Sequence, residues 1–202
     1  MKISSEQIKA LRSQTGAGMM NCKEALVQTE GDISQAIDYL RKKGLASAEK
    51  KQSRKAREGL IVSYIHTGSR LGILLEVNCE TDFVARQAEF QQLAQDLAMQ
   101  VAASPSVDYV SVDSLPADLI ERERAIELDK EDLRTKPEEI NQKIVDGRIQ
   151  KTLKTFVLLE QPYIKDSSIL IDELIKRKIA LLGENIRVAR FVRFVLGETE
   201  VH

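Results

Sequence analysis

Two apolar segments separated by a short turn constrain the fold of this chain most strongly. Residues 60–66 and 71–78 are rich in Leu, Ile and Val, and Thr67-Gly68-Ser69-Arg70 lies between them. This pattern is typical of a β-hairpin, whose strands are antiparallel. Helical patterns precede and follow the hairpin, and one further strand pattern spans 186–196. Because strands and helices do not alternate regularly, the sequence predicts an α+β fold with a mainly antiparallel sheet.

The N-terminal residues 1–45 contain three short helical patterns. Ser4-Ser5-Glu6-Gln7 has the spacing of a capping box. Asn21 offers the cap of a second helix and Asp32 the cap of a third, which Gly44 is expected to close. A compact bundle of this size is marginal in stability and is more often a docking module than a catalyst.

A basic segment at 46–57 separates this module from the rest of the chain, 58–202, which is expected to form the α+β core. Its charges are Lys50, Lys51, Arg54, Lys55 and Arg57. No aromatic side chain lies between them to stack on a base, so a solvated helical linker is favoured over a phosphate-binding patch. We expect no direct nucleic-acid binding. The formal net charge of −1 gives no case for a membrane partner either.

The segment from Asn78 to Arg86 turns the second hairpin strand into a helix. Asp82, Phe83 and Val84 place an acid, a large aromatic and a β-branched residue side by side at this corner. A Phe at a turn usually packs into its own core, and an acidic residue beside it usually caps the following helix. Taken alone, these residues leave core packing ahead of a contact role.

Several more helices are predicted after this corner. Pro137 is expected to open one of them, and Gly147 to loosen it. Gln161-Pro162-Tyr163 is interpreted as a turn. The last helix is expected to contain Ile171 and to end at Gly183.

The sequence offers no convincing catalytic group. It lacks the common motifs for nucleotide phosphates, dinucleotides, serine hydrolysis and zinc proteolysis. His66 lies at a strand end with no nucleophile near it in sequence, so a surface or contact histidine is the better interpretation. We therefore expect a binding protein rather than an enzyme, with no catalytic residue.

Metal and cofactor sites are not expected. Glu80 and Asp82 form a carboxylate pair, but two ligands are too few for a Ca²⁺ site. Cys22 and Cys79 have no partner at the spacing of a zinc site and are expected to be free thiols.

Two long motifs resemble the signatures of the translation elongation factor Ts family. The first is Leu11-Arg12 followed by Thr15–Leu26, and the second is Glu76–Arg86. The similarity continues in order through Ile144–Arg148, Gln161-Pro162-Tyr163 and the tail at 193–198, so it covers nearly the whole chain. The departures from the family pattern are few: Asn21, Glu24 and Gln87.

The resemblance implies a guanine nucleotide exchange factor that binds elongation factor Tu in its GDP-bound and nucleotide-free forms. In the family, the N-terminal module resembles ubiquitin-associated domains and docks on the nucleotide-binding domain of Tu. The matching contact residues are Arg12, Met19 and Met20. His66 lies in a hairpin that resembles one touching a distal Tu domain in longer forms, which makes it a further contact candidate.

The core motif resembles the wedge of the family, which enters the partner beside the bound Mg²⁺ and the nucleotide phosphates. The matching residues are Thr81, Asp82, Phe83 and Val84. They act on the partner's metal, so the resemblance implies no cofactor for the chain itself.

The resemblance also implies an oligomeric state. Longer relatives carry the core twice and insert a coiled coil, whereas this chain resembles a short form with one core unit and no heptad hairpin. The short form pairs two copies, so a homodimer through the core sheet with two Tu molecules is expected. Two other interpretations stay open: a non-exchanging dimeric adaptor with a docking module, and an enzyme using His66 and the acidic corner.

The expected location follows from what the N-terminus lacks. It has neither the apolar core of a signal peptide nor an Arg- and Ser-rich transit sequence. No uncharged apolar run reaches the roughly 18 residues of a membrane span. The protein is therefore expected to act where it is made, in the bacterial cytosol or the plastid stroma.

Overall fold

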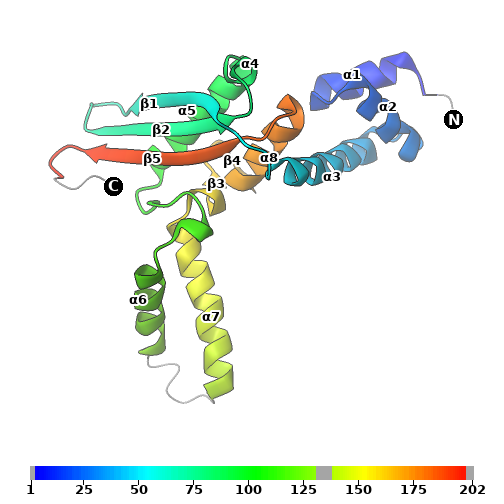
Figure 1. The fold of residues 1–202 in the computed structure, drawn as a ribbon. Helices are drawn as coiled ribbons and strands as arrows, with labels where there is room; N and C mark the ends of the chain where they lie inside the picture. Colours follow the sequence, from blue (N-terminus) through cyan, green and yellow to red (C-terminus); the bar gives the residue numbers. More distant parts are fainter. Residues whose placement is uncertain (1–2, 131–137, 199–202) are drawn as a thin grey trace. The chain divides into compact units, whose positions relative to one another are not determined.

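A computed structural model describes residues 3–130 and 138–198 and confirms the α+β fold (Figure 1). The chain divides into two compact units. Unit 1 combines the chain up to Gly59 with Asn78–Leu93 and Glu173–Arg187, and unit 2 contains the remaining segments.

The N-terminal part of unit 1 consists of three helices, α1 (Ser5–Thr15), α2 (Met19–Gln28) and α3 (Ile33–Lys51). The predicted capping box at Ser4 is confirmed, because Ser4 and Gln7 exchange side-chain hydrogen bonds with each other's backbone N–H. The predicted cap at Asp32 is confirmed as well, since its carboxylate accepts from the N–H of Gln35 at 2.9 Å. The helices enclose a small apolar core: Leu11, Cys22, Ala25, Leu26 and Ala36.

Two predicted helix boundaries in this region are wrong. Helix α2 starts after Gly18, which caps it without a side chain, so Asn21 lies inside the helix and does not cap it. Helix α3 continues through Gly44 to Lys51. A Cβ added at Gly44 would lie 3.2 Å from the Cβ of Ala180, so this glycine permits close helix packing rather than ending the helix. The domain boundaries drawn at residues 45 and 57 stay predictions.

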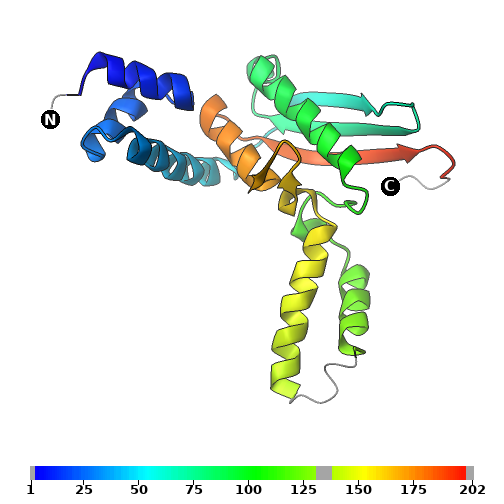
Figure 2. The ribbon, with the colours of Figure 1, turned by 180° about the vertical axis from the view of Figure 1, so that it is seen from behind.

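One three-stranded sheet contains β1 (Glu58–Ile65), β2 (Leu71–Cys79) and β5 (Arg187–Val195), in the order β1-β2-β5. The predicted hairpin is confirmed, with the N–H of His66 donating to the carbonyl of Leu71 at 2.9 Å. The predicted last strand is confirmed as β5. Helix α5 (Ala88–Ala103) crosses one face of the sheet (Figure 2). Its apolar side is buried: Phe90, Leu93, Ala94, Leu97, Ala98 and Val101.

Unit 2 also contains a pair of packed helices, α6 (Ala117–Leu128) and α7 (Glu138–Thr155) (Figure 1). A short 3₁₀ helix, η1 (Val112–Ser114), precedes α6. The two helices pack through an apolar seam that contains Leu119, Val145, Ile149 and Leu153. The sequence predicted helices here but not that two of them pack against each other, and the expected lack of a heptad hairpin stays a prediction. Gly147 does not interrupt α7, and Pro137 lies outside the described residues.

The segment after α7 was only partly predicted. The 3₁₀ helix η3 (Leu158–Glu160) leads into β3 (Pro162–Tyr163), which pairs antiparallel with β4 (Asp166–Leu170). The interpretation of Gln161-Pro162-Tyr163 as a simple turn is therefore wrong. Helix α8 (Ile171–Leu182) follows and ends at Gly183, as predicted.

Candidate functional site

The corner between β2 and α5 presents Phe83 to solvent. A single helical turn, α4 (Asp82–Ala85), follows β2 after two residues, and Thr81 caps it by accepting from the N–H of Val84 at 3.4 Å. The Phe83 side chain is 76% exposed, so it does not pack back into its own core. Val84 is only 4% exposed. These two neighbours therefore differ in kind: Val84 anchors the turn and Phe83 projects from it.

The carboxylate of Glu184 holds the backbone of this corner. It accepts hydrogen bonds from the N–H of Glu80 at 3.1 Å and the N–H of Thr81 at 3.0 Å. It also accepts from the hydroxyl of Thr81 at 2.6 Å. In return, the carboxylate of Glu80 accepts from the N–H of Asn185 at 2.6 Å. Because the corner and the turn after α8 are tied in both directions, Phe83 projects from a fixed base.

Other groups at the corner are already paired within the chain. The carboxylate of Asp82 accepts from Arg86 at 2.7 Å in an exposed ion pair. Burial raises the pKa of the Cys79 thiol to about 11, and the nearby Glu184 carboxylate adds to this effect. The thiol donates to the carbonyl of Thr81 at 3.1 Å. It is therefore neutral near pH 7 and unsuited to act as a nucleophile.

The residues matched to the docking module also belong to unit 1. Arg12 is exposed on α1, and the first two residues of α2 are exposed apolar side chains, Met19 at 39% and Met20 at 74%. Met20 therefore does not pack inside the three-helix bundle. Unit 1 therefore contains both predicted contact regions.

His66 belongs to unit 2. It is exposed at the end of β1, and its Nδ1 lies 3.1 Å from the hydroxyl of Tyr64. Its role as a partner contact stays a prediction.

The geometry of the described residues gives the acidic corner no metal site. Within 3–130 and 138–198, no three His, Cys, Asp or Glu side chains are grouped so that they could hold a metal ion. Glu80 faces Asn185 and Arg54, while Asp82 faces Arg86. Over the same residues, every helix is too short or too polar to cross a bilayer.

The signal that sequence analysis missed is the pair Glu184 and Asn185. Both lie more than 100 positions from their partners at the corner. Nothing in the local sequence around Gly183 distinguishes them from an ordinary polar turn after a helix. Their hydrogen bonds to Glu80 and Thr81, which only the folded structure shows, identify them as the support of Phe83.

The fold and the site together define an α+β protein that carries a three-helix bundle and a rigid corner with an exposed aromatic side chain. A sequence profile described as Elongation factor TS matches residues 4–198. The chain is 62% identical over 198 residues to Elongation factor Ts of Synechococcus sp. (strain JA-2-3B'a(2-13)), which covers 98% of this chain and 77% of that protein. It is 59% identical over 197 residues to the chloroplastic Elongation factor Ts of Rhodomonas salina, covering 98% and 90% of the two chains.

This chain belongs to the elongation factor Ts family. The resemblance carried by the two motifs is thereby confirmed, and with it a role in translation elongation. The family implies partnership with elongation factor Tu. The relatives named above come from a cyanobacterium and a chloroplast, which agrees with a cytosolic or plastid protein.

Proposed function

We propose that this chain is a guanine nucleotide exchange factor that binds elongation factor Tu in its GDP-bound form and promotes release of GDP. The observation that carries the proposal is the 76% exposure of Phe83 at a corner whose backbone is fixed by Glu184. An exposed aromatic on a rigid base is suited to enter a partner, because little conformational entropy is lost when it binds.

The mechanism rests on disturbing a metal and phosphate site in the partner. Mg²⁺ and backbone amides hold the phosphates of a bound guanine nucleotide. If Thr81, Asp82, Phe83 and Val84 act as a wedge, insertion of Phe83 displaces the groups that hold the metal. Asp82 then offers a carboxylate that competes for local hydrogen bonds. Loss of the cation leaves phosphate charge uncompensated, and GDP dissociates faster.

The reaction needs no covalent step and no cofactor of the chain itself. Exchange requires that the factor bind nucleotide-free Tu more tightly than nucleotide-bound Tu, and nucleotide then weakens the factor by the same ratio. Arg12, Met19 and Met20 would supply affinity through the docking module. Exposed methionines suit this role because their flexible side chains adapt to a partner surface.

Release of fluorescent GDP from purified elongation factor Tu tests this proposal. We expect the chain to accelerate release, with excess GTP trapping the emptied Tu. The adaptor interpretation predicts binding to Tu with an unchanged release rate, and that result would overturn the proposal. Turnover of a substrate by the parent chain that is lost in a His66→Ala variant would support the enzyme interpretation instead.

We further propose that two copies pair through the uncovered face of the sheet, giving a two-plus-two complex with Tu. This face carries exposed apolar side chains from all three strands: Ile61 at 70%, Ile65 at 62%, Leu74 at 44% and Phe194 at 51%. A Cβ added at Gly72 on β2 would lie 3.1 Å from Ile65 on β1, so side chains from adjacent strands meet on this face. Exposed apolar side chains gathered on one face of a sheet are suited to an interaction surface.

The mass of the chain in solution tests the pairing. We expect a dimer, and a complex with two copies of each protein when Tu is added. Ile61→Glu places a charge on this face of the sheet and should yield monomers, whereas Ile126→Glu on the exposed side of α6 should not. A monomeric parent chain at micromolar concentration contradicts the proposal.

A further inference from the structure

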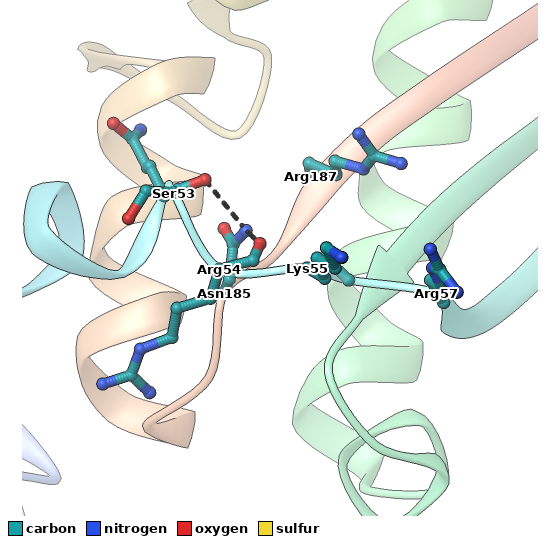
Figure 3. A pocket seen from close by; sticks show the side chains of 8 residues that line it. Ser53, Arg54, Lys55, Arg57, Asn185 and Arg187 are labelled. Carbon is teal, nitrogen blue, oxygen red and sulfur yellow. Dashed lines mark hydrogen bonds between the residues drawn. The ribbon is translucent and has the colours of Figure 1, made fainter.

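The segment that connects α3 to β1 forms one wall of a small hollow in unit 1 (Figure 3). Residues 52–57 line it together with Asn185 and Arg187, and its volume is about 270 Å³. Sequence analysis favoured a solvated linker here. In the structure, Ala56 of this segment is buried and the basic side chains around it line a concave surface.

Asn185 fixes the shape of this hollow. It is only 3% exposed, and its side-chain amide donates to the carbonyl of Gln52 at 3.2 Å and to that of Arg54 at 2.7 Å. Its backbone N–H donates to Glu80. A single buried side chain therefore holds two backbone carbonyls of the connecting segment, and the wall of the hollow is pre-formed.

The charges around the hollow are unbalanced. Lys55, Arg57 and Arg187 are exposed, and within the described residues none of them forms a salt bridge or side-chain hydrogen bond. In Figure 3, Lys55 and Arg57 follow one another along the connecting segment, Arg187 lies on the neighbouring strand, and the Arg54 side chain extends away from all three. Arg54 is paired with Glu80 at 3.5 Å, so its charge is partly neutralised.

Three cations that line one hollow of about 270 Å³ repel one another. An anion bound between them would relieve this repulsion. Arginine forks and a lysine ammonium are the usual partners of phosphate oxygens. The local charge and the pre-formed wall therefore both favour a phosphate-bearing ligand.

We propose that this hollow binds a short chain of phosphate groups, either a free oligophosphate or the phosphate chain of a nucleotide. Its volume lies below the usual range of about 300–1,000 Å³ for drug-sized ligands, which suits phosphate groups without an enclosed base. No aromatic side chain lines it. Single-stranded nucleic acid is held largely by stacking on such side chains, so an oligophosphate is favoured over RNA.

The test uses the full chain without elongation factor Tu and measures binding by calorimetry and by thermal melting at about 50 mM and 150 mM salt. Tripolyphosphate should bind and raise the melting temperature, because a ligand that binds only the folded state stabilises it. The affinity should fall as salt rises. Pyrophosphate and GDP are titrated in parallel. Binding of the free phosphates alone identifies an inorganic ligand, and equal binding of GDP identifies a nucleotide; both support the site.

The triple variant Lys55→Ala, Arg57→Ala, Arg187→Ala should weaken tripolyphosphate binding about tenfold or more, since it removes the charge-assisted contacts. The matched control, Lys9→Ala, Lys23→Ala, Lys42→Ala, removes the same charge from exposed positions of unit 1 and should bind as the parent does. All six side chains are exposed, so neither variant should unfold. Equal binding by parent and triple variant, equal losses in both variants, or tighter binding of a single-stranded RNA than of tripolyphosphate overturns the proposal.

Discussion

Replacing Phe83 by alanine is expected to slow the GDP release promoted by the chain about 10- to 100-fold, without altering its fold. A buried Phe side chain contributes about 1.5–3 kcal/mol, and each 1.4 kcal/mol corresponds to a factor of ten in rate. The side chain is 76% exposed in the free protein, so its removal takes little from the chain's own core. The measurement is the rate of fluorescent GDP release at several concentrations of the variant.

A control variant separates the wedge from general loss of apolar surface. Ile126 on α6 is 52% exposed, and Ile126→Ala should leave the release rate within twofold of the parent. Melting temperatures of both variants should match that of the parent. If Phe83→Ala promotes release as fast as the parent, Phe83 is not the wedge, although the family assignment stands.

The local sequence predicted the existence of the corner but not its geometry. The change from an apolar strand pattern to helical periodicity placed the end of the strand at Asn78. In the structure β2 ends one residue later, at Cys79, and Thr81 caps the helical turn that follows. The exposure of Phe83 could not be predicted in this way. It depends on Glu184 and Asn185, whose hydrogen bonds to the corner join residues more than 100 positions apart.

Glycine has two structural roles in this chain, and the local sequence pattern does not distinguish them. Gly183 adopts a φ of +83° and ends α8, as its position after an apolar helix predicts. Gly44 lies inside α3, where its missing side chain leaves room for Ala180 on α8. The second role is set by a partner helix far along the chain, so the same residue type was misread as a stop.

Strands without apolar alternation were missed for a related reason. β4 has the sequence Asp166-Ser167-Ser168-Ile169-Leu170, and only Ile169 is buried. Its pairing with β3 places Tyr163 where its hydroxyl donates to Asp96 at 2.6 Å. The polar contacts that define this hairpin come from α5, and no periodic signal in residues 161–170 reports them.

Arg193 is the largest departure from the rule that charged side chains of a strand face water. It is 8% exposed, and its guanidinium donates to four backbone carbonyls and one carboxylate in the segment that ends α5: Val101, Ser104, Pro105, Val107 and Asp108. Carbonyls at a helix C-terminus lack partners within the helix, and the helix dipole favours a cation there. Arg193, on strand β5, thus supplies hydrogen-bond donors to the backbone carbonyls at the end of α5.

We expect Arg193→Met to lower the free energy of unfolding by about 3–5 kcal/mol, because methionine fills similar space but leaves buried carbonyls unpaired. Arg193→Lys should lose less, since an ammonium keeps the charge and donates three hydrogen bonds at most. Arg190→Met is the matched control on the same strand: the Arg190 side chain is 76% exposed and forms an exposed ion pair with Glu76, so its loss should cost less than about 1 kcal/mol. Urea unfolding of the three variants gives these free energies. If Arg193→Met lowers the free energy of unfolding no more than Arg190→Met does, the carbonyls at the end of α5 do not need the guanidinium as a hydrogen-bond donor.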